Sequence, residues 1–499
     1  MPQRLEEIIT ESLNRHRNEP CYWWEGTWST GADLLKLTED CEAALRASGF
    51  GRGQRLVVMM KNCPMVLALS IAVWRLGGAF CPLNVAAGIP SLKGTLELIE
   101  PAGAVIAPDV QDDVIAVLDE AGWPHAVCPP KGPLPSFKCR PGKPEDEDLA
   151  VIFATSGTTG APKAVPLTHG NLIDNCRCLR DVVPALQEGR VILTVLPNFH
   201  SFGYTVATIL PLTMNARLAI VPAFLPPQPA MRAILEAPVD ITFAVPAIYA
   251  YLLMAVERGK FPREGLARQK LLVSGGDRLN PNLHEQALHL TGRDIMEGYG
   301  LTETSPVVTI NHSYETHRTG SVGPFLDSYE YKLRTREGQD TQENEGVLWV
   351  RGPSVTRGYF RAPELTADRF EDGWFNTGDY VRIEDGFVRI LDRVTDILIV
   401  GGFNVFPQDV EKVLAGHPAV QTAIVVGIPH DINGEVPKAY IQRKDGATVT
   451  ERELIRYAKE HLAHFKAPRS IEFVDEFPLS GTGKILRRIL RERAGKKSL

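Results

Sequence analysis

Residues 149–163, LAVIFATSGTTGAPK, decide how the rest of this sequence is interpreted. The apolar run Leu149–Ala154 predicts a buried strand. Thr155–Lys163 follows it with two glycines, whose backbone N–H groups turn readily toward an anion, and with hydroxyl donors and a lysine. This is the chemistry of a phosphate cradle, although the Gly-Lys-Ser/Thr ending of a Walker A loop is absent from the stretch. A flexible surface loop rich in Ser, Thr and Gly is the structural alternative.

The first half of the chain alternates strand-like with helix-like segments. Arg55–Met60 and Ala79–Leu83 predict strands, and Pro64–Leu76 between them predicts a buried helix. Ala104–Ala107 and Asp112–Ala121 repeat the alternation. The pattern predicts an α/β fold in which helices flank parallel-type sheets within a large body of several subdomains.

Composition narrows the class of protein. The chain has 499 residues, of which 44% are hydrophobic and 23% charged, and this is typical of a globular protein with several cores. The net charge of −6 excludes a global basic field for nucleic acid. The best membrane candidate, Met65–Trp74, is far shorter than the roughly 20 residues that a span needs. Because the N-terminus also lacks the apolar core of a secretory signal, we expect a cytoplasmic protein.

The eight cysteines predict buried thiols rather than disulfides or a metal site. They all lie in the first 178 residues, and none belongs to a Cys-x-x-Cys pair. The twelve histidines include no His-Glu-x-x-His motif.

Residues 376–393, NTGDYVRIEDGFVRILDR, predict a β-hairpin, because Asp385-Gly386 between two alternating runs is a strong turn signal. A two-residue turn there places Asp379 opposite Asp392 and brings it to the same end as Arg393. The segments that follow predict a compact α+β unit with strands at Ile397–Val400, Ala423–Ile428, Ala439–Arg443 and Ile471–Val474, and helices at Gln408–Gly416 and Glu451–Phe465, the second with a capping box at its start. We therefore predict one domain over residues 1–391 and another over residues 392–499.

Four further motifs lie downstream of the glycine-rich stretch: EGYGLTE at 297–303, TGD at 377–379, DR at 392–393 with GGFNVFP at 401–407, and PLSGTGK at 478–484. In this order and at these spacings, the chain resembles the adenylate-forming superfamily of acyl-CoA synthetases, adenylation domains and luciferases, from about Gly53 to Arg491. Residues 196–203 and 297–311 look most like fatty acyl-CoA ligases and acyl-carrier-protein synthetases.

The resemblance implies a two-step ligase. A carboxylate attacks the α-phosphate of ATP to give acyl-AMP and pyrophosphate, and a thiol, by default CoA, then forms the thioester. The first domain would bind ATP and the acyl group, and the small second domain would be mobile and carry the catalytic lysine. An acyl carrier protein as thiol acceptor and an aryl acid as substrate are the alternatives. The acyl chain length and the oligomeric state stay open.

The resemblance also implies a set of nucleotide contacts. The β- and γ-phosphates would be held by Thr155, Ser156, Gly157, Thr158, Thr159, Gly160 and Lys163. Thr302 would donate to the α-phosphate, and Glu303 would bind Mg²⁺, which prefers a carboxylate together with phosphate oxygens. Tyr299 would pack on the adenine ring with room from its neighbours Gly298 and Gly300. A second adenine loop would be formed by Gly275, Gly276 and Asp277, for which an ordinary tight turn is the alternative.

On the other side of the nucleotide, the resemblance implies that Asp379 accepts the ribose hydroxyls and that Arg393 supports the ribose or a phosphate. A structural Asp–Arg bridge is the alternative. Lys484 would be the catalytic lysine, as a long-stemmed ammonium in a glycine-rich loop reaches both carboxylate and phosphate. The alternative is one more solvated lysine in the basic tail, which could also meet an acidic partner or a membrane surface.

The same resemblance implies a hinge near Asp392–Thr395 and a pantetheine tunnel lined by Gly401 and Gly402. At the hinge and near these CoA contacts, Thr395 and Ile399 depart from the residues common in the family.

His200 lies in the motif that contacts the acyl group in the family. Histidine cannot supply the fixed negative charge that pairs with an α-ammonium group, so an amino acid substrate is disfavoured. An apolar acyl pocket is suggested by Phe199, Phe202, Tyr204, Val245, Pro246 and Tyr249, although some of these would simply be core. We expect a medium- or long-chain fatty acid.

Overall fold

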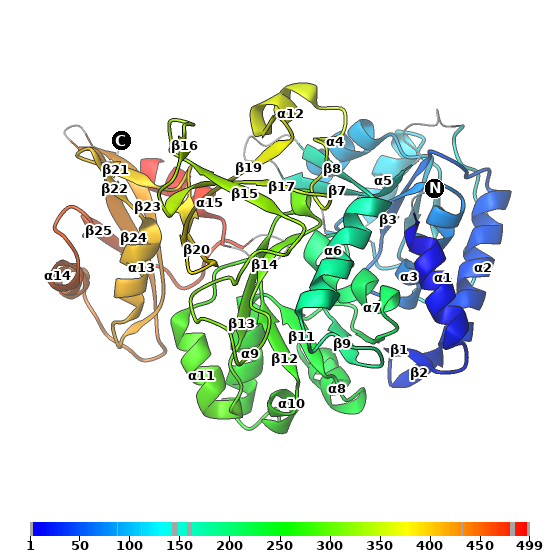
Figure 1. Cartoon of the computed structure of the whole chain (residues 1–499), viewed down its shortest axis with the longest axis horizontal. Helices are drawn as coiled ribbons and strands as arrows, with labels where there is room; N and C mark the ends of the chain where they lie inside the picture. Colours follow the sequence, from blue (N-terminus) through cyan, green and yellow to red (C-terminus); the bar gives the residue numbers. More distant parts are fainter. Residues whose placement is uncertain are drawn as a thin grey trace. The chain divides into compact units, whose positions relative to one another are not determined.

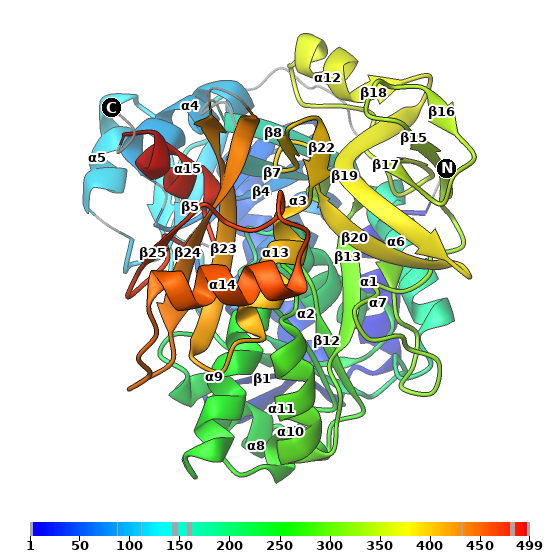
Figure 2. The same cartoon turned by 90° about the vertical axis from the view of Figure 1, so that its left-hand side faces the viewer.

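The computed structural model describes residues 3–86, 88–110, 112–141, 148–156, 162–430, 433–479 and 485–496, and Figures 1 and 2 show its elements from two sides. The chain divides into two compact units. Unit 1 comprises Met1–Glu330, Val350–Phe375 and Gly386–Val388, and unit 2 comprises Tyr331–Trp349, Asn376–Asp385 and Arg389–Leu499.

The alternating segments of the first half form a six-stranded sheet in unit 1, in the order β6-β5-β3-β4-β7-β8. Its strands are β3 Arg55–Met59, β4 Ala79–Pro82, β5 Gly103–Ile106, β6 His125–Val127, β7 Leu149–Ser156 and β8 Pro162–Thr168, and the intervening helices are α3 Pro64–Arg75, α4 Ile89–Ile99 and α5 Asp112–Glu120. β3 pairs in parallel with β4 and β5, whereas β7 and β8 form an antiparallel hairpin. The predicted α/β fold with parallel strands is confirmed.

Helix α3 illustrates how the sequence dictates this layer. It begins at Pro64, and proline fits a first helical turn because its missing N–H would have no partner there. Every residue from Pro64 to Trp74 is buried, as expected for a helix that is apolar on all sides. The indole Nε1 of Trp74 donates to the carbonyl of Ala150 at 2.7 Å and so joins α3 to β7.

A second, eight-stranded sheet completes unit 1, in the order β14-β13-β12-β11-β9-β10-β1-β2. The six inner strands are parallel, and β2 and β14 pair antiparallel at the edges. The strands are β1 Pro20–Trp24, β2 Thr27–Thr30, β9 Val191–Thr194, β10 Arg217–Ile220, β11 Ile241–Ala244, β12 Leu271–Ser274, β13 Met296–Gly300 and β14 Val307–Ile310. The remaining helices of unit 1 are α1 Leu5–Arg15, α2 Gly31–Ala47, α6 His169–Val182, α7 Leu210–Thr213, α8 Gln228–Glu236, α9 Pro246–Glu257, α10 Glu264–Ala267, α11 Pro281–Thr291 and α12 Pro363–Arg369. Figure 1 shows α8 to α11 grouped beside β12 and β13.

A π-helix, η1 (Phe202–Ile209), follows the predicted acyl motif and runs into α7. Its wide turn requires a close backbone approach at Gly203, where a Cβ atom would lie 2.3 Å from the carbonyl oxygen of Pro197. Only glycine fits there, and π-turns are frequent at functional sites.

The predicted β-hairpin is present as β19 and β20. Its sheet runs in the order β16-β15-β17-β19, and β20 pairs with β19. The strands are β15 Glu330–Arg334, β16 Asp340–Thr341, β17 Glu345–Arg351, β19 Trp374–Glu384 and β20 Phe387–Arg393. Asp385 and Gly386 both have positive φ, at 50° and 80°, as a two-residue type I′ turn requires. In unit 1, β18 (Phe370–Glu371) pairs with the first residues of β19.

The rest of unit 2 is the expected α+β arrangement. A sheet in the order β22-β21-β24-β23, with β25 beside β24, packs against α13 and α14, and Figure 2 shows α14 in front of its strands. The elements are β21 Leu398–Val400, β22 Phe403–Val405, α13 Pro407–Ala415, β23 Val420–His430, β24 Gly434–Arg443, α14 Glu451–His461, β25 Ser470–Phe473 and α15 Arg487–Lys496. The capping box of Thr450 and Glu453 is present at the start of α14. The helix ends at His461 rather than Phe465, because Leu462 is already extended.

The basic tail is not simply a solvated helix. In α15, Leu490 and Ala494 are buried against a cluster that includes Tyr440. The Arg487 guanidinium forms an ion pair with Glu411 of α13.

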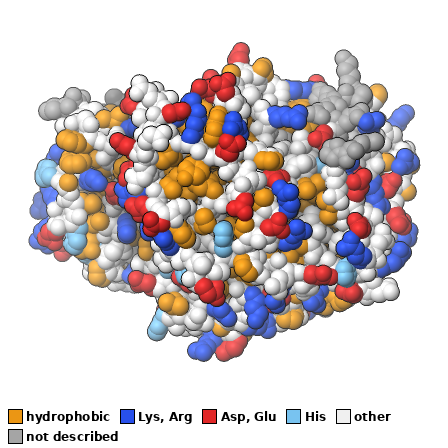
Figure 3. Space-filling model, viewed as in Figure 1, with side chains coloured by type: hydrophobic (Ala, Val, Ile, Leu, Met, Phe, Trp, Pro, Cys, Tyr) orange, Lys and Arg blue, Asp and Glu red, His pale blue; other side chains and the backbone are white. Residues whose placement is uncertain are grey.

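All eight cysteines are buried and free of disulfides, as predicted. Burial raises the pKa of the Cys21, Cys41, Cys63, Cys81, Cys128, Cys139 and Cys176 thiols. On the surface, Lys and Arg side chains lie intermixed with Asp and Glu over the face drawn in Figure 3. Over the described ranges, no helix has both the length and the apolar character needed to cross a membrane.

Candidate active site

The glycine-rich stretch joins two paired strands. Thr155 near the end of β7 lies opposite Lys163 in β8, so the segment between them starts and finishes on neighbouring strands. The predicted phosphate contacts Gly157, Thr158, Thr159 and Gly160 lie outside the described residues, and for Thr155 and Ser156 only the backbone is described. The Lys163 Nζ lies 5.7 Å from the centre of the Tyr359 ring.

The predicted Thr302–Glu303 pair forms a short 3₁₀ turn, η2 (Thr302–Thr304), directly after β13. The Leu301 N–H donates to the Thr304 hydroxyl at 3.0 Å and so fixes the start of the turn. The Ser201 hydroxyl donates to the Thr302 hydroxyl at 3.2 Å, which brings the acyl motif against the turn. Because the Thr302 oxygen accepts this bond, its own O–H is left to donate elsewhere.

Glu303 is held at both its backbone and its side chain. Its carbonyl accepts from the N–H of Thr356 at 2.8 Å, and its Oε1 accepts from the Tyr359 hydroxyl at 2.8 Å. Tyr359 was not predicted as a site residue, because it follows no recognised motif and contacts Glu303 only through the fold.

The side chains of this turn offer hard oxygen atoms as metal ligands, the carboxylate of Glu303 and the hydroxyl of Thr302, and such oxygens suit Mg²⁺. Within the described ranges, no group of three or more His, Cys, Asp or Glu side chains is arranged to hold a metal ion by itself. The residues therefore fit a Mg²⁺ ion held by one carboxylate together with phosphate oxygens, rather than an ion in a closed protein cage.

The two predicted adenine segments lie side by side. Ser274 of β12 pairs with Glu297 of β13, and a Cβ atom on Gly275 would lie 3.4 Å from the Gly298 carbonyl oxygen. Gly300 has a packing reason of its own, since a Cβ atom there would lie 2.0 Å from the Pro306 carbonyl oxygen. The loop continues with Gly276, whose φ is 79°, and with Asp277, which is exposed.

A titratable cluster supports the second of these segments. The Oε1 of Glu297 accepts from the N–H of Gly320 at 3.1 Å and lies 3.4 Å from the His284 Nε2. The His284 Nδ1 lies 2.6 Å from the Asp294 Oδ1, and His317 Nε2 lies 2.8 Å from Oδ2 of the same carboxylate. Burial opposes the charged imidazole of His284, but its hydrogen bonds with Asp294 and Glu297 outweigh burial and raise its pKa to about 9.

His200 lies two residues before the π-helix, and its Nδ1 accepts from the N–H of Phe202 at 3.3 Å. The Phe202 ring lies over Gly275, 3.2 Å from where a Cβ atom would be, and meets Phe243 edge-on at 6.4 Å. Phe202 therefore lies where the acyl motif and the adenine loop meet.

Two aromatic residues expected at the acyl pocket belong to the core instead. Tyr204 is fully buried, stacks on Phe80 and donates to the Ser70 hydroxyl at 2.8 Å. Tyr249 is also fully buried and donates to the carbonyl of Thr242 at 2.7 Å. Sequence alone cannot separate such residues from a pocket lining, because both environments select the same aromatic side chains.

Asn198, which lies in the motif before the π-helix, has a structural role. Its amide donates to the carbonyl of Met60 at 2.9 Å and to the Asn62 Oδ1 at 3.2 Å. The Asn62 amide in turn donates to the carbonyls of Leu196 and Val221, so this buried pair ties the ends of the two sheets together.

In unit 2, the predicted meeting of Asp379 and Arg393 is confirmed. The Arg393 Nε lies 2.6 Å from the Asp379 Oδ1. The Thr377 hydroxyl donates to the carbonyl of Leu348 and accepts the N–H of Asp379, which fixes the backbone of the TGD motif. Burial raises the pKa of the neighbouring Asp392 to about 7.

Gly401 and Gly402 form the exposed turn between β21 and β22, with φ values of 57° and 87°. Of the two residues that depart from the family pattern, Ile399 is 46% exposed and Thr395 is also exposed. Lys484 lies outside the described residues.

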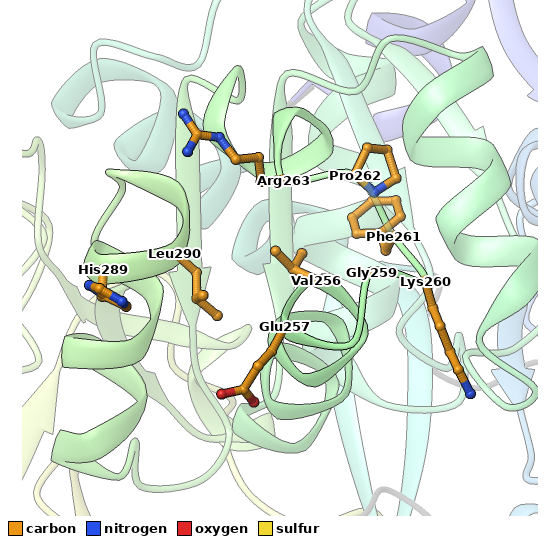
Figure 4. A pocket seen from close by; sticks show the side chains of 9 residues that line it. All are labelled: Val256, Glu257, Gly259, Lys260, Phe261, Pro262, Arg263, His289 and Leu290. Carbon is orange, nitrogen blue, oxygen red and sulfur yellow. The ribbon is translucent and has the colours of Figure 1, made fainter.

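A surface pocket of about 730 Å³ is separate from these motifs. It lies between α9 and α11, and Figure 4 shows the side chains around it. Its lining consists of Val256, Glu257, Gly259, Lys260, Phe261, Pro262, Arg263, His289 and Leu290, none of which is a predicted site residue.

Comparison with known proteins matches the chain to nucleotide-binding enzymes. The family model described as AMP-binding enzyme matches residues 9–360, and the model of the AMP-binding enzyme C-terminal domain matches residues 409–484. A long-chain-fatty-acid–CoA ligase of Yersinia pestis is 37% identical over 351 residues, which are 69% of this chain and 61% of that relative. A feruloyl-CoA synthase of an Amycolatopsis species is 31% identical over 94% of this chain and 95% of its own length.

Among solved structures, the crystal structure of ATP-bound MatB from Rhodopseudomonas palustris superposes with a TM-score of 0.88 at 29% identity, covering 98% of this chain and 99% of that one. The first family model spans the glycine-rich stretch and residues 297–303, and the second includes residues 478–484. The chain therefore belongs to the AMP-binding enzyme family, the adenylate-forming superfamily that its motifs resemble.

Proposed function

We propose that the protein is an ATP-dependent acid–thiol ligase of the AMP-forming kind. The observation that supports this most directly is the arrangement within unit 1. There the strand end bearing Lys163 and the carboxylate of Glu303 are linked through Tyr359, and the two adenine segments meet at Gly275 and Gly298.

In the first step, a carboxylate oxygen of the acid attacks the α-phosphorus of ATP. The bond from this phosphorus to the bridging oxygen breaks, and pyrophosphate leaves with the bonding electrons. Because both substrates are anions, the work of the protein is to position them and to stabilise the charge of the transition state. Lys163 and the hydroxyls of 155–159 would hold the leaving phosphates, Thr302 would donate to the α-phosphate, and Lys484 would bridge the carboxylate and the α-phosphate.

Glu303 is the residue that would bind Mg²⁺, which, when bound, neutralises phosphate charge. On the ribose side, Asp379 would accept the hydroxyls, and Arg393 would hold that carboxylate in place.

In the second step, a thiolate attacks the acyl carbon and AMP leaves. We propose that CoA is the thiol and that Gly401 and Gly402 line its pantetheine path. We further propose that residues 392–499 act as a mobile domain beyond a boundary at 391/392, and that the protein works in the cytoplasm. An acyl carrier protein is the alternative acceptor, since it presents the same pantetheine arm.

For the acid, we propose a medium- or long-chain fatty acid. His200 supplies no fixed negative charge, and its Nδ1 accepts a backbone N–H, which argues against a substrate ammonium group at this position. A second candidate is an aryl acid, which is favoured by the Phe202 ring beside Gly275, with Phe243 edge-on to that ring, and by the relative named feruloyl-CoA synthase. Neighbouring chain lengths would be separated by only about 1–3 kcal/mol per methylene.

The test is acid-dependent exchange of labelled pyrophosphate into ATP, across fatty acids, hydroxycinnamic and benzoic acids and free amino acids. We expect exchange with fatty acids and none with amino acids. Exchange with aryl acids alone would select the second candidate, and the absence of exchange with every acid would refute a ligase. Product thioesters formed with CoA or with holo acyl carrier protein would then identify the acceptor.

A further inference from the structure

We propose that Tyr359 is a positioning residue of the nucleotide site, which orients the Glu303 carboxylate and holds it in a fixed relation to Lys163. This inference rests on the proposed function, because it assigns the metal-binding role to Glu303. Tyr359 belongs to the segment that follows β17, far along the chain from both of these residues. Its hydroxyl donates to the Glu303 Oε1 at 2.8 Å, and the centre of its ring lies 5.7 Å from the Lys163 Nζ.

Tyr359 is itself held firmly. It is 7% exposed, its N–H donates to the Thr366 hydroxyl at 2.9 Å, and its ring meets Phe370 edge-on at 6.1 Å. The next residue, Phe360, donates its N–H to the carbonyl of Ala164 at 2.8 Å. Since Ala164 directly follows Lys163 in β8, the segment that carries Tyr359 is fastened beside the lysine.

The same segment is fastened to the turn on its other side. The N–H of Thr356 donates to the Glu303 carbonyl at 2.8 Å, and the Thr356 hydroxyl donates to the carbonyl of Pro166 in β8 at 2.6 Å. Residues 356–360 therefore bridge the strand that ends the glycine-rich stretch and the turn that carries Glu303. Within residues 356–360, Tyr359 is the residue whose side chain contacts the Glu303 carboxylate.

The direction of the Tyr359–Glu303 bond follows from the chemistry of the two groups. An ionised carboxylate has only acceptor oxygens, so in this 2.8 Å contact the phenol O–H of Tyr359 is the donor. A bond to one carboxylate oxygen fixes the plane of the carboxylate and therefore the direction in which the other oxygen points. The face of the same ring attracts the Lys163 ammonium, because an aromatic face is electronegative.

The variant Tyr359→Phe separates the hydroxyl from the ring, since it keeps the ring beside Lys163 and removes the donor. Binding of ATP is measured by calorimetry with Mg²⁺ present and with EDTA. We expect the affinity for the Mg²⁺ complex to fall about tenfold, the usual scale of a hydrogen bond to a charged group, while ATP in EDTA binds within about twofold of wild type. The Mg²⁺ concentration at half-maximal pyrophosphate exchange should rise by a similar factor.

A matched control is Tyr251→Phe, which removes the hydroxyl of a 43% exposed tyrosine in the same unit. It should leave both affinities unchanged. The variant Tyr359→Leu removes the ring as well, and we expect an additional loss of about threefold for ATP in EDTA.

Tyr359 acts through Glu303 only if the two changes are not additive. In the Glu303→Gln background, Tyr359→Phe should therefore cause no further loss of Mg²⁺-dependent affinity. Equal losses with and without Mg²⁺, or full additivity with Glu303→Gln, would overturn the inference. Failure of the proposed function is distinguishable, because the wild type itself would then show no acid-dependent pyrophosphate exchange.

Discussion

The guanidinium of Arg393 meets the carboxylate of Asp379 through an Nε–Oδ1 contact of 2.6 Å. The two partners differ sharply in exposure, since the side chain of Asp379 is 3% and that of Arg393 52% exposed. A buried carboxylate paired with an exposed cation across a hairpin suits two purposes. The pair can be a structural bridge, or Asp379 can accept the hydroxyls of a diol while Arg393 keeps its carboxylate charged and oriented.

The variant Asp379→Asn distinguishes these purposes. Asparagine keeps the shape but loses the charge, so a ribose acceptor would weaken ATP and AMP binding by about tenfold, measured by calorimetry. A purely structural bridge would instead lower the thermal midpoint and leave nucleotide affinity unchanged. Glu345→Gln is the matched control, because it breaks the ion pair with Arg382 of β19 and has no proposed contact with the nucleotide.

Lys484→Ala should slow acyl-adenylate formation by about 100-fold, because it removes a charge that stabilises the transition state of the first step. Thioester formation from presupplied acyl-AMP should be spared. Single-turnover assays of the two half-reactions check this, with Lys459→Ala, a change at an exposed lysine of α14, as control. An equal loss in both half-reactions would contradict the role given to Lys484.

Glu303→Gln should raise the Mg²⁺ concentration needed for half-maximal exchange by about tenfold, because the amide cannot replace the anionic oxygen that Mg²⁺ prefers. A Mg²⁺ titration of pyrophosphate exchange at saturating ATP measures the shift. An unchanged titration would show that Glu303 is not a ligand.

The His284 cluster predicts a pH dependence of stability. The pKa of His284 is about 9 in the folded protein and 6.5 in its ordinary state. Between these two pH values the folded protein therefore keeps a proton on His284 that the unfolded protein has lost. The stabilisation is complete below pH 6.5 and is lost as the pH rises through 9. Urea denaturation at pH 6.5 and 9.5 should reveal a fall of about 2 kcal/mol, which the variant His284→Gln should largely abolish.

The control for this prediction is His289→Gln on the exposed side of the same helix, α11. It should keep the wild-type slope of stability against pH. A His284→Gln protein with an unchanged slope would assign the titration to another group.

Local sequence patterns predicted many of the helices, strands and turns. The apolar helix from Pro64 and the strands around it were predictable, because burial on all sides requires an unbroken apolar run. The Asp385-Gly386 turn was predictable because few residue pairs tolerate two positive φ angles. The pairing of β1 with β10 was not, because no local period records which strand lies beside which.

The residues of the candidate site also fall into a predictable and an unpredictable group. Sequence motifs predicted Glu303 and Thr302 as candidate site residues, and the hairpin brought Asp379 and Arg393 together as expected. Tyr359 and His284 carry no motif, and their contacts with Glu303 and Glu297 arise only when distant segments pack. The domain boundary at 391/392 and the role of Lys484 stay predictions.

The buried cysteines have a consequence for an enzyme of this kind. An acyl-adenylate reacts with any accessible thiolate, so an exposed cysteine near its release would be acylated in place of the intended acceptor. In this chain all eight thiols are buried, and in seven of them burial raises the pKa and so disfavours the thiolate. The folded protein thereby protects itself from its own activated intermediate, and self-acylation becomes a chemical signature of local unfolding between residues 21 and 178.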